Sequence, residues 1–306
     1  MPRWPAWVLA IGGGLLAVFG LGAAQLVAQG ELDADLRLLG ILTLVGLIAF
    51  GAGLVYAALR QIRIRSVLPP ERYRGPSVFI LLALALLIAG LLTAPFGADI
   101  LALDAGEGEL SLLGSTVILA AIGIGLLTVG YLFVYRPRAL DALPRFPGPD
   151  AGGAIRAGLG WGIVAWLGST IVAALVVIVL EALGIESQPE AAERAIAQLD
   201  PILVVLAIVV LAPIAEESFF RGIVFNAWYR EAGRRWAYIG SAALFAAVHL
   251  SFVTLVPIFL LGLALAWVYE RTQSLLAPMV MHATVNGISV AIALLVRYDV
   301  IRLPTT

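Results

Sequence analysis

Long apolar runs separated by short polar breaks dominate the chain. Five runs are clear, at 7–28, 38–59, 77–98, 112–135 and 157–183. Four less regular ones follow, at 201–220, 237–255, 257–270 and 275–296. A helix needs about 20 apolar residues to cross the hydrocarbon core of a bilayer. The pattern therefore predicts an all-α, polytopic transmembrane bundle of about eight or nine membrane helices, some short or broken in the C-terminal core.

Composition narrows the class of protein further. Of the 306 residues, 61% are hydrophobic and 13% charged, and the mean hydropathy is +1.02, far above a soluble domain of this size. The net charge of -1 gives no basic excess that would suit nucleic acid. Cysteine is absent, which excludes disulfides, thiolate catalysis and cysteine metal sites. We expect an integral, multi-pass membrane protein, in the plasma membrane of a prokaryote, that contacts lipid and no nucleic acid.

The polar breaks alternate in charge and so predict an orientation. Breaks at 60–76, 136–156, 221–236 and 270–274 hold fourteen of the nineteen arginines, and the breaks between them are acidic. Arginine-rich loops stay in the cytoplasm. We therefore expect a cytoplasmic N-terminus.

A segment rich in proline and glycine divides the chain. "RPRALDALPRFPGPDAGG" favours a loop over a helix. We predict an N-terminal four-helix transmembrane region at 1–136, a cytoplasmic linker at 137–153 and a catalytic transmembrane core at 154–306. Breaks in a membrane helix are tolerated only where protein or water covers the freed backbone groups, so the irregular core is the expected place of function.

Ionisable side chains gather in this core, although each costs roughly 2.5 to 3.5 kcal/mol at mid-helix. In "APIAEESFFRG", Glu217 and Arg221 are four residues apart, share a helix face and can pair. Glu216 is rotated by about 100° and points elsewhere. Pro213 removes a backbone hydrogen bond just before them and is expected to bend the helix.

The chain has two histidines, His249 and His282, and both lie in apolar runs. His282 shares a helix face with Asn286, and His249 shares one with Phe245. At 1.5 Å per residue along helices of the predicted orientation, both histidines and Glu216 reach the cytoplasmic half of the membrane.

This set of groups suits acid–base hydrolysis of an acyl bond. Glu216 and one imidazole can activate water, while the second imidazole and the Asn286 amide donate to a developing oxyanion. Structural readings stand beside it: a membrane histidine often only bonds a neighbouring helix, Glu217 with Arg221 can be a clamp, and Phe245 a packing residue. Ser218 has no G-x-S-x-G context that would mark it as a nucleophile.

Three motifs at these positions carry a family resemblance. "EESFFR" matches E-E-x-x-x-R, "FAAVH" matches F-x-x-x-H and "HATVN" matches H-x-x-x-N or D. Over residues 155–296 the chain resembles the CAAX protease and bacteriocin-processing family of intramembrane proteases, which includes the type II CAAX prenyl endopeptidases and the Abi proteins.

The resemblance implies roles for the motif residues. Glu216 and His249 would activate water, His282 and Asn286 would form the oxyanion hole, and Glu217 and Arg221 would support them. It implies a glutamate-dependent mechanism without a metal cofactor. A zinc site on Glu216, His249 and His282 stays open, although H-E-x-x-H is absent.

The sequence thus predicts an intramembrane endopeptidase whose site faces the cytoplasmic leaflet and whose substrate is a membrane-associated, optionally prenylated peptide. One alternative is a non-enzymatic binding or immunity module that keeps the family fold. Another is a transporter with a Glu–His proton relay, which predicts inverted repeats that the sequence lacks. Substrate identity and oligomeric state are left open.

Overall fold

All regular structure among the described residues is helical, which confirms the all-α prediction. The computed structural model describes residues 4–28, 35–97, 111–140, 146–184, 196, 198–249, 251 and 253–301. The helices are α1 (Trp4–Ala28), α2 (Leu36–Arg65), α3 (Val78–Thr93), η1 (Ala94–Phe96), α5 (Leu112–Gly130), η2 (Tyr131–Tyr135), α6 (Ala151–Ala182), α8 (Pro201–Val204), η3 (Val205–Leu211), α9 (Ala212–Phe219), η4 (Phe220–Phe225), α10 (Asn226–Ala232), α11 (Arg234–Ala247), α12 (Leu255–Thr272) and α13 (Leu276–Arg297).

Eight segments of the described chain are long and apolar enough to cross a membrane. They are Trp4–Ala23, Arg37–Arg65, Val78–Phe96, Leu112–Tyr135, Ala151–Ala182, Pro201–Ala232, Leu255–Thr272 and Leu276–Arg297. The predicted polytopic bundle is therefore confirmed. α11 has 14 residues, or about 21 Å of helix, and is the short member that the pattern anticipated in the C-terminal core.

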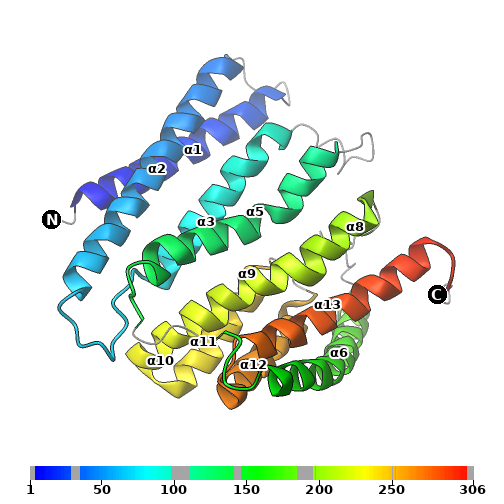
Figure 1. Ribbon diagram of the computed structural model, residues 1–306. Coiled ribbons are helices and arrows are strands. Elements are labelled where there is room, and N and C mark those ends of the chain that lie inside the picture. The colour runs from blue at the N-terminus through cyan, green and yellow to red at the C-terminus, as the bar shows by residue number, and fades with distance from the viewer. Residues whose placement is uncertain are drawn as a thin grey trace.

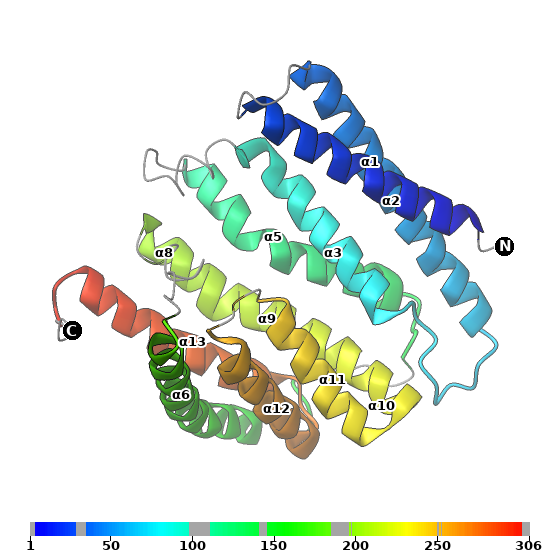
Figure 2. The same ribbon diagram turned by 180° about the vertical axis from the view of Figure 1, so that it is seen from behind.

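The helices lie in successive rows (Figures 1 and 2). α1 and α2 form one edge, α3 and α5 the next row, and the long helix from α8 to α10 follows. α6, α12 and α13 form the opposite side, with α11 beside α12. One apolar core runs from Leu81 in α3 through Leu126 in α5 to Phe219 in α9 and Met281 in α13. The long middle helix, which carries the E-E-x-x-x-R motif, thus contacts both sides of the bundle.

Two glycines let α6 lie close against α13. A Cβ atom on Gly158 would lie 2.7 Å from the Ala277 carbonyl oxygen, and one on Gly162 would lie 2.6 Å from Thr284 Cβ. Small residues four apart allow this approach of two membrane helices, where hydrophobicity alone gives little attraction. The contact fixes the position of α13, the helix that carries His282.

The predicted break at 221–236 is wrong, because the helix that starts at Pro201 continues to Ala232. Gly233, with φ at 86°, separates it from α11. Helical turns can continue beyond the hydrocarbon core when polar side chains reach water, so arginines mark the membrane edge and not the end of the helix. The same reason explains why α2 runs to Arg65, whereas α6 begins at Ala151, inside the predicted 137–153 linker, because the Asp150 side chain caps it by accepting the Gly153 N–H at 2.8 Å.

The middle helix is irregular on both sides of α9. Val205–Leu211 and Phe220–Phe225 are π-helical, so the motif carboxylates lie in a short α-helical stretch between two wider ones. The first irregular stretch lies directly before Pro213, as the missing N–H at that residue predicts. π-helical turns are frequent at functional sites, because they change the direction in which side chains point.

Candidate active site

Glu217 and Arg221 form the ion pair that their spacing predicts, in complete burial. Arg221 Nη1 lies 2.9 Å from Glu217 Oε1, and both side chains are 0% exposed. Arg221 also donates to the Gly262 carbonyl at 2.9 Å, and its guanidinium carbon lies 4.5 Å from the centre of the Phe245 ring. Arg221 therefore joins the motif helix to α12 and α11.

His282 binds the same carboxylate, a contact that the sequence did not indicate. His282 Nδ1 lies 3.0 Å from Glu217 Oε1, and the imidazole is buried. A carboxylate only accepts, so Nδ1 carries the proton and donates. Nε2 then faces away from Glu217 and can donate only when the ring holds a second proton.

Glu216 lies on the other side of this imidazole. Its Oε2 atom is 4.0 Å from His282 Nε2, and its side chain is 16% exposed. Oε2 is buried and accepts no hydrogen bond from any described residue. Two polar atoms 4.0 Å apart can both contact one oxygen atom at hydrogen-bonding distance. Glu216 and Glu217 thus occupy different faces, as predicted, and the ring of His282 separates them.

His249 follows the last residues of α11 and is exposed. Its Nδ1 lies 2.7 Å from the Phe245 carbonyl oxygen, an acceptor, so Nδ1 carries the proton and Nε2 is left to accept. The Phe245 ring packs against both histidines, with its centre 4.9 Å from the His249 ring and 5.7 Å from the His282 ring. Phe245 therefore brings the second motif next to the first and third.

Asn286 contacts the motif helix instead of His282. Its Nδ2 atom donates to the Ile208 carbonyl at 2.8 Å. Ile208 lies in the first π-helical stretch, where the Ala212 N–H reaches back to Ala207 and Pro213 has no N–H to give. The Ile208 carbonyl thus lacks a helical donor, and the Asn286 amide supplies one. The predicted oxyanion role needs the second Nδ2 hydrogen and stays a prediction.

Two further side chains donate to carbonyls of the same helix, and the sequence reasoning missed both. Tyr135, which lies in η2 at the end of α5, donates a hydrogen bond from its hydroxyl to the Ser218 carbonyl at 2.8 Å. Asn226 Nδ2 donates to the Arg221 carbonyl at 2.7 Å and to the Tyr269 hydroxyl at 2.8 Å. No spacing rule relates Tyr135 to Ser218 or Asn226 to Tyr269, because each of these bonds joins two different helices.

The zinc site left open by the sequence is not assembled in this geometry. Over the residues that the structure describes, no three His, Asp or Glu side chains lie close enough together to hold a metal ion. Glu217 already binds His282 Nδ1, and Nε2 is the single nitrogen that this ring could offer to a ligand. We therefore derive no step through a metal.

The residues of this site lie in a segment that is similar to a known protein family. Residues 198–288 match the family described as Type II CAAX prenyl endopeptidase Rce1-like. The predicted family resemblance is confirmed over this segment. It is shorter than the predicted 155–296, but it includes all three motifs.

Bacterial relatives match over similar lengths. YdiL of Bacillus subtilis, whose name describes a candidate membrane peptidase, is 30% identical over 34% of this chain and 42% of its own. An uncharacterised 24.3 kDa protein of Escherichia coli is 36% identical over 29% of this chain and 44% of its own. YxdF of Lactococcus lactis is 30% identical over 25% of this chain and 42% of its own. The chain thus spans less than half the length of these relatives. No solved structure matches the chain significantly.

Proposed function

We propose that the chain is an intramembrane peptidase that hydrolyses a peptide bond of a membrane-associated substrate. The observation that carries the proposal is the buried Oε2 atom of Glu216, which accepts no hydrogen bond from the described part of the chain and lies 4.0 Å from His282 Nε2. This atom can accept a hydrogen bond from a water molecule that His282 Nε2 also contacts, which puts a candidate general base within reach of the proton it would take.

The reaction follows from the tautomers of the two histidines. Glu216 takes one proton from water while His249 Nε2 accepts a hydrogen bond from the hydroxide that forms, and the oxygen of that hydroxide bonds to the carbonyl carbon. The oxyanion receives a hydrogen bond from His282 Nε2 when that ring is doubly protonated. The C–N bond then breaks as Glu216 returns its proton to the amine. The products are a carboxyl group and a free amine.

Glu217 and Arg221 act through His282. Glu217 fixes the proton on Nδ1 and the plane of the ring, and Arg221 holds the Glu217 carboxylate in place. This is the arrangement in which a carboxylate orients an imidazole that contacts the reacting atoms. Both are therefore proposed as positioning residues.

The substrate is argued from the membrane setting and the family match. The site lies on a helix long enough to span a bilayer, so a peptide that reaches it is itself held at the membrane. A prenylated C-terminal peptide is one candidate that the matched family suggests, and an unmodified membrane peptide is the other. Arginine-rich breaks at the same end as the motif favour entry from the cytoplasmic leaflet.

The test uses purified protein in lipid vesicles with membrane-anchored peptides. Peptides are chosen from proteins whose termini change when the membrane proteome is compared with and without this chain. Glu216→Ala and His249→Ala are expected to lose cleavage. Ser218→Ala is the matched control, because its hydroxyl donates to the Ile214 carbonyl within the helix, and it should retain cleavage.

Two outcomes would count against the proposal. Undiminished cleavage by Glu216→Ala would contradict the role of the carboxylate, and binding of the peptide by wild type without any cleavage would favour the binding module. Treatment with a chelator separates the glutamate-dependent mechanism from one that uses a metal ion, since loss of activity would indicate a metal.

A further inference from the structure

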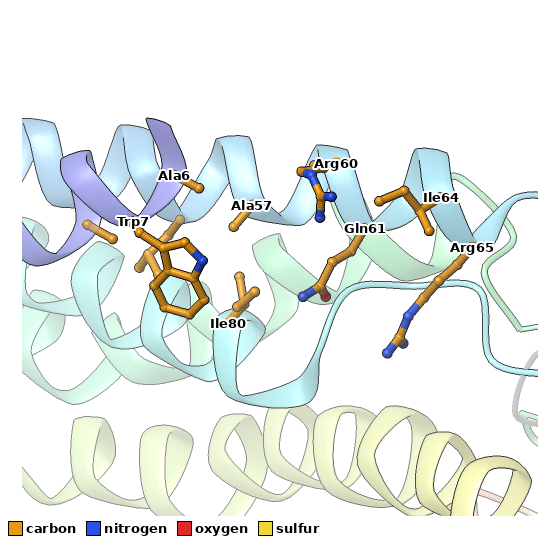
Figure 3. Close-up of a pocket in the computed structure, with 10 residues that line it drawn as sticks. Ala6, Trp7, Ala57, Arg60, Gln61, Ile64, Arg65 and Ile80 are labelled. Carbon is orange, nitrogen blue, oxygen red and sulfur yellow. The ribbon is translucent and has the colours of Figure 1, made fainter. Parts of the chain in front are cut away.

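A cavity of about 380 Å³ lies between α1, α2 and α3 (Figure 3), and α1 and α2 form the edge of the bundle opposite α13 (Figure 1). Its volume falls in the range of sites that hold small molecules. Most of its wall is apolar, and its polar side chains come from the last two turns of α2. The residues that line it are Ala6, Trp7, Ala10, Leu54, Ala57, Arg60, Gln61, Ile64, Arg65 and Ile80.

The polar end of the cavity is held in place by the loop that follows α2. Gln61 accepts the Ser77 N–H at 2.6 Å through Oε1, which turns its amide nitrogen toward the cavity (Figure 3). Arg65 donates to the Gly75 carbonyl at 2.9 Å, and its guanidinium lies over the ring of Tyr73 at 5.6 Å. Tyr73 is 1% exposed, and burial raises the pKa of its phenol, so it stays neutral.

Charge at this end of the bundle is strongly positive. Residues 60–76 contain five arginines and one glutamate, a sum of +4. The Arg65 guanidinium is matched by Glu231 of α10, 3.0 Å away. Arg60 brings positive charge to the cavity wall itself, on the same side of α2 as Ile64 (Figure 3). The cavity therefore complements an anionic group attached to an apolar body.

The rim of the cavity faces outward from the bundle. Trp7 is 62% exposed and Ile64 is 51% exposed, and both belong to segments long enough to span a bilayer. In a membrane such faces contact lipid, and tryptophan and arginine prefer the level of the headgroups. A molecule that enters here from the bilayer would have its polar end beside Arg60 and its chains along the alanines and Leu54.

We propose that this cavity binds a phospholipid with an anionic headgroup, whose phosphate lies at Arg60 and Gln61. Basic pockets between membrane helices suit such headgroups, and each arginine near an anionic surface strengthens binding by about 1 kcal/mol. The site is separate from the carboxylates and histidines, so it stands whether or not the chain is a peptidase.

The experiment measures lipid binding to the delipidated full chain in detergent by native mass spectrometry. Phosphatidylglycerol is titrated against phosphatidylcholine, and sodium phosphate is added in a third arm. Wild type should bind phosphatidylglycerol in preference to phosphatidylcholine. Arg60→Gln should weaken that binding about fivefold, as one lost arginine predicts. Arg63→Gln is the matched control, an exposed arginine of the same turn outside the cavity, and should change it less than twofold.

A second variant tests the cavity without touching its charge. Ala57→Phe fills the apolar part and should lower the number of bound phosphatidylglycerol molecules by one, while the unfolding temperature without lipid stays close to that of wild type. Equal binding of the two lipids, or binding unchanged in both Arg60→Gln and Ala57→Phe, would overturn the proposal. Displacement of phosphatidylglycerol by millimolar sodium phosphate would show a site for a free anion and would overturn it too.

Discussion

Replacing Arg221 by methionine should destabilise the protein more than the same replacement of any surface arginine. Arg221 is 0% exposed, and the change leaves the Glu217 carboxylate buried with His282 as its single remaining partner among the described contacts. Removing one member of a buried ion pair costs about 3–5 kcal/mol, because the other charge stays uncompensated. The lost donor to the Gly262 carbonyl acts in the same direction.

The assay is reversible unfolding in mixed micelles, followed by helical circular dichroism as the denaturing detergent fraction rises. Arg221→Met should lower the free energy of unfolding by about 3–5 kcal/mol. Adding Glu217→Gln removes the stranded charge and should restore about 2 kcal/mol. Exposed Arg235→Met is the control and should stay within about 0.5 kcal/mol. A loss below about 1 kcal/mol for Arg221→Met, or additive losses in the double variant, would refute the reasoning.

Two other changes test the supports of the site. Gly158→Leu should cost about 1–3 kcal/mol of stability and lower cleavage, because the new side chain would push α13 and His282 away from α6. Gly160→Leu is the control and should be tolerated, since a Cβ atom there meets nothing within 4 Å. Thermal unfolding of both variants checks this. Asn286→Ala should cost about 1–3 kcal/mol in the same unfolding assay, since the Ile208 carbonyl would lose its donor, and unchanged stability with lost activity would instead favour a pure oxyanion role.

Regular patterns made much of this architecture predictable. Hydropathy located the spanning helices, because bilayer thickness sets their length, and it erred mainly where arginines continue a helix beyond the hydrocarbon. The four-residue spacing of Glu217 and Arg221 predicted their contact, which the structure has at 2.9 Å. Periodicity also separated Glu216 from Glu217, since residues one apart point about 100° away from each other.

The partners of the polar side chains could not be predicted in the same way. His282 bonds to Glu217, 65 residues earlier, and Asn286 bonds to Ile208, 78 residues earlier. Each contact depends on how two helices are rotated, which packing at residues such as Gly158 decides. Pro213 was the one signal in the sequence that an acceptor in the preceding turn would be freed, and it did not say which side chain would serve it.

Labelling with heavy oxygen tests most directly whether Glu216 activates water and does not attack the substrate itself. Cleavage is run in H2¹⁸O with protein in excess over a membrane-anchored peptide, so that each molecule turns over at most once. If Glu216 takes a proton from water, one ¹⁸O atom appears in the new carboxyl group of the product and none in the protein fragment that contains Glu216. A heavy atom in that fragment, or product without label, would contradict the account.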